Sequence, residues 1–255
     1  MPFPNFTDKY NGHPIMRPED TLAMRRRFGN FPQGEPPHGL IFCLKNDLPH
    51  KLRWQIPVQK AGRILGDFYR IKSTRGRVGV LSNFGIGAPV VASLAEEMIA
   101  WGVKQFIVLS WGGAIQPSLN TGDLMLVDKA IRDEGVSHHY LPAEKFTHAD
   151  AALTQRIASR LPQIQSGATW TTDAPYRETR EEILAYQADG VQVVEMEIAA
   201  LFTLGKVHDV PAAAAVVVAD RLANLKWESP ADMISINRSF ETAYFAAIAV
   251  LNEDA

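Results

Sequence analysis

The sequence has 255 residues, with 26 Lys and Arg against 28 Asp and Glu, a formal net charge of −2, and 46% hydrophobic residues. A chain of this length can bury one large core, so one main domain is expected. The near balance of charge excludes a general electrostatic attraction to nucleic acid or to anionic membranes. A small, discrete ligand is therefore the better expectation.

The sequence has no apolar run near the ~20 residues that span a bilayer, and no basic start followed by an apolar core. The single cysteine, Cys43, lies in the apolar run Leu40–Leu44 and has no partner within the chain. We expect it to pack in a core strand in a reducing compartment. These features predict a cytoplasmic protein.

Residues 1–38 are rich in proline, with a short charged stretch at Met24–Arg27. Proline fixes the backbone and removes a hydrogen-bond donor, so this segment is predicted to cross a surface as an arm rather than to join a sheet. Such an arm can reach a neighbouring subunit. Residues 39–255 are predicted to form one catalytic domain.

Gly39–Leu44 is predicted to be a buried strand, and Phe68–Lys72 and Val78–Ser82 alternate like the strands of a hairpin. Gly85 and Gly87 then precede a helical pattern over Val90–Trp101. A Gly-x-Gly between strand and helix allows a ligand close to the positively polarised helix end. Alone it also fits an ordinary tight turn.

Phe106–Ser110 is predicted to be a second buried strand, with a glycine-rich turn at Trp111–Gln116. Residues 148–165 have helical periodicity, and a final helix is predicted from about Pro230 to Leu251 with one apolar, core-packing face. No metal site is expected, because the adjacent side chains of His138 and His139 diverge and no cysteine joins them.

The stretch from Gly190 to Asp220 carries the strongest chemical signal. Two carboxylates, Glu195 and Glu197, flank Met196 at the start of an apolar segment. Asp220 follows the apolar run Pro211–Ala219, so it is predicted to lie at the carboxyl end of a buried strand, where open α/β sheets bind ligands. The plain alternative is a helix start with favourable acids and a solvent-facing aspartate.

Glu195-Met196-Glu197 followed by Ala-Ala, together with the later Ala219-Asp220, resembles the nucleoside phosphorylases of the hexameric purine and uridine type, a family that includes nucleosidases. The block Ala130–Gly135, which reads Ala-Ile-Arg-Asp-Glu-Gly, adds to the resemblance, which covers roughly residues 40 to 250. The resemblance implies an α/β fold with three α/β/α layers and a central mixed, partly barrel-like sheet.

The resemblance also implies roles for the acids. Glu197 would bond the 2′- and 3′-hydroxyls of a ribose, Met196 would pack under the sugar, and Glu195 would shape the turn. Asp220 would be the catalytic acid that protonates the departing base, for which burial must raise its pKa. Arg221 fits the pyrimidine-binding arginine of the uridine type, so the choice of base stays open.

The implied base-binding and anion-binding residues follow the family's other segments. The base contacts implied are Thr172, Asp173, Tyr176 and Arg221, although Pro175 replaces a stacking phenylalanine. The implied phosphate or anion site comprises Gly87, Arg70 and Gly112.

The sequence departs from the family where phosphate binds. Val108 stands in place of a strand arginine and Trp111 in place of a threonine or serine, and valine cannot hold phosphate by charge-assisted bonds. The nearest other arginine after the first strand is Arg53.

The resemblance therefore implies cleavage of the N-glycosidic bond of a nucleoside, with transfer of the pentosyl group to phosphate. The alternatives are a nucleosidase that uses water and a non-catalytic nucleoside-binding protein. No cofactor is implied, and phosphate would be the co-substrate. A homo-oligomer is implied, either a dimer or a hexamer of dimers, with His13 or His38 of the arm reaching the sugar's 5′ position.

Overall fold

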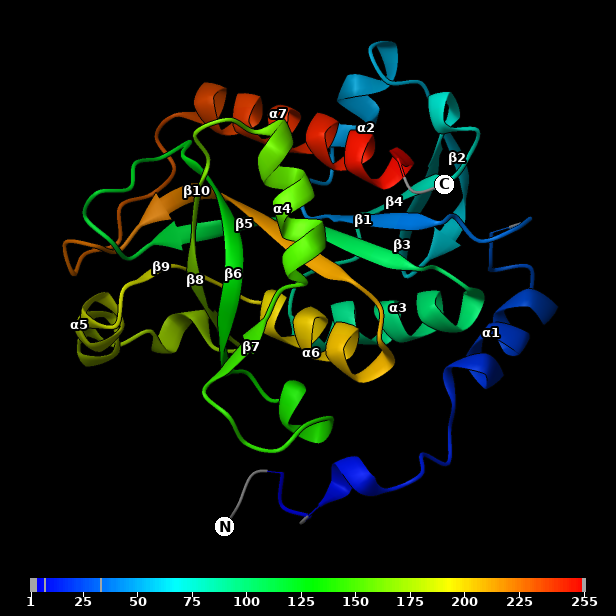
Figure 1. Ribbon diagram of the computed structural model, residues 1–255, viewed down its shortest axis with the longest axis horizontal. Helices are drawn as coiled ribbons and strands as arrows, with labels where there is room; N and C mark the ends of the chain where they lie inside the picture. The colour runs from blue at the N-terminus through cyan, green and yellow to red at the C-terminus, as the bar shows by residue number, and fades with distance from the viewer. Residues whose placement is uncertain (1–3, 7, 33, 254–255) are drawn as a thin grey trace.

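The computed structural model describes residues 4–6, 8–32 and 34–253. In this part of the chain the strands form one mixed sheet with helices on both faces (Figure 1). The strands are β1 (Gly39–Cys43), β2 (Val58–Ile64), β3 (Gly66–Ile71), β4 (Val78–Ser82), β5 (Gln105–Ala114), β6 (Leu124–Asp133), β7 (Phe146–His148), β8 (Gln165–Thr172), β9 (Val191–Glu195) and β10 (Ala212–Arg221). The α-helices are α1 (Pro18–Arg27), α2 (Leu48–Lys51), α3 (Ala88–Trp101), α4 (Ala151–Arg160), α5 (Arg180–Ala188), α6 (Ile198–His208) and α7 (Met233–Glu253).

Five of the strands close into a ring. The sheet order is β10-β6-β8-β9-β5-β1-β4-β3-β2, and β10 also pairs with β5. Strands β5, β10, β6, β8 and β9 therefore form a small closed barrel. Strands β1 to β4 extend the sheet away from it, with β1 parallel to both β4 and β5. The predicted mixed, partly barrel-like sheet is confirmed.

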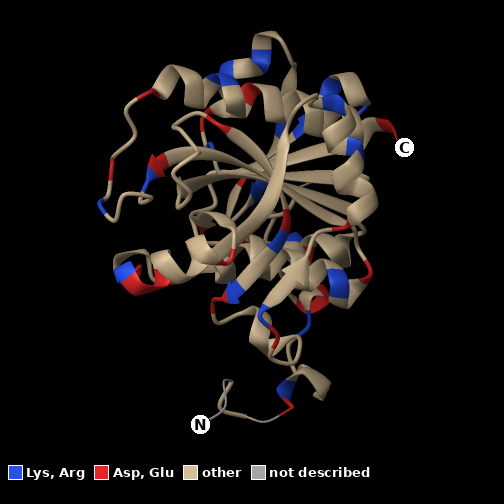
Figure 2. Ribbon diagram, turned by 60° about the vertical axis from the view of Figure 1, so that its left-hand side comes forward, with Lys and Arg blue, Asp and Glu red and all other residues tan. Residues whose placement is uncertain are grey.

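Two apolar cores lie on opposite faces of the sheet. One core packs α3 and α6 against alternate side chains such as Phe106 and Val108 of β5. The other packs α4 and α7 against the intervening side chains, among them Ile107 and Leu109. Because side chains alternate along a strand, a continuous apolar run serves both cores, which gives the predicted three layers. In Figure 2 charged residues lie mostly on helices and loops, and long stretches of the strands carry neither sign.

The predicted glycine-rich turn at Trp111–Gln116 was wrong, because β5 continues through Trp111, Gly112 and Gly113. The glycines serve close packing instead of a turn. A Cβ on Gly112 would lie 2.5 Å from Val216 Cγ1, and one on Gly113 would lie 2.6 Å from Leu222 Cδ1. Glycine therefore allows β9 and β10 to close onto β5.

The arm has more structure than its proline content predicted. Residues 18–27 form α1, which begins with Pro18 at its first position and packs on α3. Leu22 is buried there, and Arg25 Nε lies 2.8 Å from Glu97 Oε2 in a largely buried ion pair. Strand β2 was not predicted; it mixes polar and apolar side chains, most of them exposed or half-buried, and it forms an edge of the sheet.

Candidate functional site

The candidate site lies at a gap in the strand pairing along one side of β5. Strand β1 runs parallel to β5 and its last pair is Cys43 with Leu109. Strand β9 approaches the same side from the opposite direction, and pairs Val194 with Gly113. Residues 110–112 therefore lie between the facing carboxyl ends of two strands. Open α/β sheets bind ligands at the carboxyl ends of their strands, so this gap is the expected place for a site.

Glu197 projects into this gap from the N-terminus of α6. Its carboxylate accepts a hydrogen bond of 2.6 Å from the Gly87 amide and one of 3.4 Å from the Ser110 hydroxyl. Gly87 has a φ of 100°, which favours glycine and aims its N–H at Glu197. Burial raises the pKa of Glu197, while the hydrogen bond from Gly87 opposes that rise. The carboxylate is thus held in place by residues that follow β4 and belong to β5.

Both carboxylate oxygens of Glu195 accept hydrogen bonds, one from the start of α6 and the other from hydroxyl groups of β8. Its Oε2 accepts the amide N–H groups of Glu197 and Ile198, at 2.7 and 2.8 Å, at the start of α6. Its Oε1 accepts the hydroxyls of Thr171 and, at 3.3 Å, Thr169. A carboxylate at a helix N-terminus satisfies amides that lack a partner in the helix. Glu195 therefore fixes the first turn of α6 and, through it, the direction of Glu197.

The carboxyl groups of Glu195 and Glu197 also interact electrostatically. Burial, together with the neighbouring Glu197 carboxylate, raises the pKa of Glu195 to about 8. Met196 lies between them and is half-buried. The segment predicted to bind ribose is thus assembled in one place, with Glu195 serving as its internal support.

Asp220 lies on the other side of β5 from this segment. It pairs with Gly113, whose other neighbour is Val194 of β9. A Cβ on Gly113 would be 3.4 Å from Asp220 Oδ1 and 3.3 Å from Val194 Cγ1. Because Gly113 has no side chain, only its backbone lies between Asp220 and Val194. The end of β10, which carries Asp220, and the end of β9, which leads into Glu195 and Glu197, therefore lie close together.

The carboxyl group of Asp220 is half-buried at the end of β10. Burial raises its pKa above the ordinary aspartate value, and a 2.6 Å hydrogen bond from Trp227 Nε1 partly opposes the rise. Trp227 is itself largely exposed, in the loop that follows β10. This environment is the kind that a general acid requires.

Glu178 was missed by the sequence analysis. It is half-buried before α5, and burial together with the charge of Asp220 raises its pKa to about 7. Its only signal in the sequence was its place next to Thr179 and Glu182, which form the capping box of α5. The proximity of Glu178 to Asp220 arises from the fold and not from any local motif.

The other predicted base contacts differ in exposure and have separate partners. Thr172 is buried and its hydroxyl accepts the Ala174 amide, whereas Asp173 is exposed and accepts the Gly135 amide at 2.7 Å. Tyr176 is 99% exposed, so it stacks on nothing in this chain. Arg221 is bound to Glu228 at 3.2 Å.

The predicted anion residues have other partners within this chain. The Gly87 amide is used by Glu197, and Gly112 packs against Val216. Arg70 pairs in register with Gly79, away from the end of β4, and its guanidinium binds the carbonyls of Gly76 and Glu35. Within one chain Arg70 therefore anchors the arm, and its predicted reach to a partner subunit stays a prediction.

The two departures from the family pattern have clear structural roles. Val108 is fully buried in the core beneath α3 and α6. Trp111 faces α7, where its ring lies 4.8 Å from that of Phe240, and its Nε1 donates to the Leu44 carbonyl at 3.0 Å. Lys45, which the sequence analysis gave no role, lies over the same ring at 5.5 Å.

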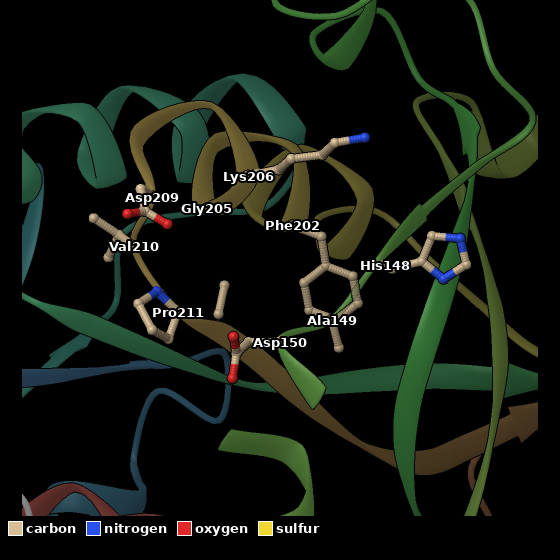
Figure 3. Close-up of a pocket in the computed structure, with 10 residues that line it drawn as sticks. His148, Ala149, Asp150, Phe202, Gly205, Lys206, Asp209, Val210 and Pro211 are labelled. Carbon is tan, nitrogen blue, oxygen red and sulfur yellow. The ribbon is translucent and has the colours of Figure 1, made fainter. Parts of the chain in front are cut away.

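A separate cavity of about 330 Å³ lies near the start of β10 and the end of α6 (Figure 3). Phe202 and Ala149 border one side and the Asp209–Pro211 segment borders the other. Asp220 is near the opposite end of β10, so this cavity is distinct from the site. Among the described residues, no group of three or more His, Cys, Asp or Glu side chains is placed to hold a metal ion, and no helix is long and apolar enough to cross a membrane.

Two nucleoside phosphorylases resemble part of this chain in sequence. Uridine phosphorylase of Salmonella typhimurium is 29% identical over 147 residues, which are 51% of this chain and 58% of that protein. Purine nucleoside phosphorylase DeoD-type of Streptococcus uberis is 30% identical over 152 residues, which are 57% of this chain and 64% of that protein. The matches thus span rather more than half the length of these relatives.

A solved structure and a family model extend the comparison. The uridine phosphorylase of Vibrio fischeri ES114 has a TM-score of 0.69 and 23% identity, over 85% of this chain and 91% of its own, which shows the same fold. The model of the phosphorylase superfamily matches residues 43–249, a range that contains Glu195, Glu197 and Asp220. The chain belongs to the phosphorylase superfamily.

Proposed function

We propose that this protein cleaves the N-glycosidic bond of a nucleoside and transfers the pentosyl group to phosphate. The observation that carries the proposal is Glu197, a buried carboxylate held by the Gly87 amide and the Ser110 hydroxyl at the gap beside β5. Asp220 lies across Gly113 from the same segment. The uridine and purine nucleoside phosphorylases among the relatives support this class of reaction.

In this proposal Glu197 binds the sugar. A carboxylate accepts hydrogen bonds from the 2′- and 3′-hydroxyls, and its negative charge favours the oxocarbenium-like sugar of the transition state. Because Gly87 and Ser110 already fix the carboxylate, little reorganisation is needed when the sugar arrives. Met196 packs beneath the sugar, and Glu195 holds the helix turn that carries both residues.

Asp220 is proposed to protonate the base. As an oxygen of phosphate bonds to C1′, the bond from C1′ to the base nitrogen breaks and its electron pair goes to the base. Asp220 donates a proton to that nitrogen, and the proton lost by phosphate restores the acid. A carboxyl whose pKa is raised by burial is protonated over a wider pH range, which suits this role.

Hydrolysis is the second candidate, because Val108 and Trp111 stand where the family pattern has phosphate ligands. A buried valine supplies no charge to an anion. Water would then attack C1′ and free sugar would be the product. A non-catalytic nucleoside-binding protein is the third candidate.

One experiment separates the three. Base release from a panel of purine and pyrimidine nucleosides is measured with phosphate and in phosphate-free buffer, and the sugar product is identified. A requirement for phosphate with a sugar 1-phosphate as product supports phosphorolysis. Equal release in both buffers with free sugar supports the hydrolase, and nucleoside-dependent thermal stabilisation without any release supports the binding protein.

We also propose a homo-oligomer in the cytoplasm. Tyr176 is fully exposed although the family resemblance gives it to the base, which suggests that a second copy covers this side of the site. Size-exclusion chromatography coupled to light scattering measures the assembly, and a monomer would contradict this part of the proposal.

A further inference from the structure

Lys45 is a buried cation that the proposed roles leave unused. It is the second residue after β1, and its side chain is only 10% exposed. The Leu44 amide donates to the Leu109 carbonyl at 3.0 Å, which places Lys45 beside residues 110–111 of β5. Ser110 in turn contacts Glu197. The lysine therefore lies at the β1 end of the gap, and Glu197 lies at the β9 end.

A second connection ties Lys45 to the same site. The Asn83 amide donates to Asn46 Oδ1 at 2.9 Å, which joins the loop after β1 to the loop after β4. The loop after β4 contains Gly87, whose amide holds Glu197. The backbone around Lys45 is thus fixed relative to Glu197 by hydrogen bonds on two sides, a requirement for a preorganised binding group.

The charge around Lys45 favours an anion. Its ammonium is paired with Asp47, but Lys51 contacts the same carboxylate at 2.5 Å. One carboxylate thus serves two ammonium groups and leaves this cluster with a net positive charge. Lys51 can keep Asp47 when Lys45 turns to a ligand, and the Trp111 ring supports the ammonium at 5.5 Å.

We propose that Lys45 binds an oxyanion at the carboxyl end of β1, and that inorganic phosphate is this anion in the reaction. The proposal rests on the phosphorolysis proposed above. Lys45 supplies the positive charge that neither Val108 nor Trp111 provides, by exchanging Asp47 for a phosphate oxygen. Lys45 then holds the phosphate at the β1 end of the gap, and Glu197 holds the sugar at the β9 end.

The test compares Lys45→Met with Lys51→Met. Both lysines contact Asp47, but the side chain of Lys51 is 52% exposed and lies one helix turn further on. Losing a charge-assisted hydrogen bond should raise the KM for phosphate in Lys45→Met by about tenfold to a hundredfold, with the KM for nucleoside little changed. Lys51→Met leaves Asp47 to Lys45 alone, so it should raise the KM for phosphate far less than Lys45→Met does, by about twofold to threefold, and should leave the KM for nucleoside unchanged.

A variant that should change the KM for phosphate in the opposite direction separates ligand binding from a structural ion pair. Asp47→Asn removes the anion that competes for Lys45, so the KM for phosphate should fall. If Lys45 only stabilises the loop, Asp47→Asn and Lys45→Met would both impair the enzyme. An unchanged KM for phosphate in Lys45→Met would overturn the proposal.

Thermal unfolding with increasing inorganic phosphate gives a readout without turnover. Phosphate should raise the Tm of the wild type and of Lys51→Met, and this shift should be lost in Lys45→Met. Equal shifts in all three proteins would reject Lys45 as the ligand. If the wild type cleaves nucleosides without phosphate, phosphorolysis fails, while the phosphate-dependent Tm still decides whether Lys45 binds an oxyanion.

Discussion

The sugar side and the base side of the site differ in how completely one chain builds them. On the sugar side, Glu195 and Glu197 have hydrogen-bond donors on both carboxylate oxygens, and both are buried. On the base side, Asp173 and Tyr176 are exposed, and Arg221 is paired with Glu228. Asp220 and Glu178 are half-buried there, and burial raises the pKa of each.

This difference follows from the elements that carry the residues. The glutamates lie where β9, α6 and β5 meet, so the core fixes their positions. The base side consists of the loop before α5 and the loop after β10, where few apolar contacts restrain the chain. The sugar end is therefore preformed, and the base end is the part that substrate or a second copy would complete.

The largest expected effect is that of Asp220→Asn. An amide cannot donate the proton that the departing base needs, so kcat should fall by about 10³-fold, within the range for a lost general acid. The KM for nucleoside should change little, because the sugar side is intact. Steady-state kinetics checks this, and an active Asp220→Asn protein would mean that base departure is assisted elsewhere.

The donor to Asp220 gives a matched variant. In Trp227→Phe the hydrogen bond from Nε1 is lost, and that bond lowers the pKa of Asp220. The pKa should rise further, so the basic limb of the pH dependence of kcat should move to higher pH while the maximal rate is kept. An unshifted limb would remove Asp220 as the titrating acid.

Glu197→Gln should have the next largest effect and should act on the sugar. We expect the KM for nucleoside to rise and kcat to fall together, with a combined loss in kcat/KM of about 10²-fold, as for other buried transition-state contacts. Unchanged kinetics would exclude Glu197 from the site. The Tm of the variant is the control that separates lost binding from lost folding.

The contrast between the two sides also explains what the sequence could predict. Glu195, Met196, Glu197 and Asp220 were predicted as site residues because each stands beside a long apolar segment with a clear pattern, and their proposed roles came from the family resemblance. Lys45 and Glu178 were missed because their neighbours, Trp111 and Asp220, are far away in the chain. Proximity of that kind depends on the strand order, which no local pattern contains.

The glycines of β5 show the same limit. Gly112 and Gly113 read as a turn, because paired glycines commonly end a strand. Their actual use follows from the closure of β9 and β10 onto β5, which only the tertiary structure shows. The mixed sheet itself was predicted through the family resemblance, since hydrophobic periodicity does not specify which strands pair.

Thr171→Val tests the support beneath the sugar side. The Thr171 hydroxyl donates to Glu195 and accepts the Ala199 amide at 3.0 Å, and it is fully buried. Valine of the same shape leaves the Ala199 amide unsatisfied and leaves Glu195 Oε1 with only the 3.3 Å hydrogen bond from Thr169, so the free energy of unfolding should fall by about 1–3 kcal/mol. Thr203→Val is the control, because the buried Thr203 hydroxyl has no hydrogen-bond partner and its loss should be nearly neutral. Chemical denaturation of both variants measures the difference, and equal losses would show that Glu195 needs no such support.

Glu178 gives the smallest expected effect, on the base side. Its pKa is near 7 in the folded protein, above the ordinary glutamate value, so the folded state favours the protonated form. Its contribution to stability is therefore complete below about pH 4.5 and is lost as the pH rises through 7. Because Glu178 is only half-buried, solvent screening should limit the loss to about 1 kcal/mol or less.

The measurement is the free energy of unfolding between pH 5 and pH 8 in the wild type and in Glu178→Gln. The glutamine variant should lose part of the decline with pH, since its side chain does not titrate. Glu181→Gln, which alters an exposed residue of α5, should keep the whole decline. An identical decline in all three proteins would place the titration elsewhere and would leave Asp220 as the carboxyl on the base side with a raised pKa. A decline reduced only in Glu178→Gln would show that the base side, although open to water, already holds two interacting carboxyl groups before substrate binds.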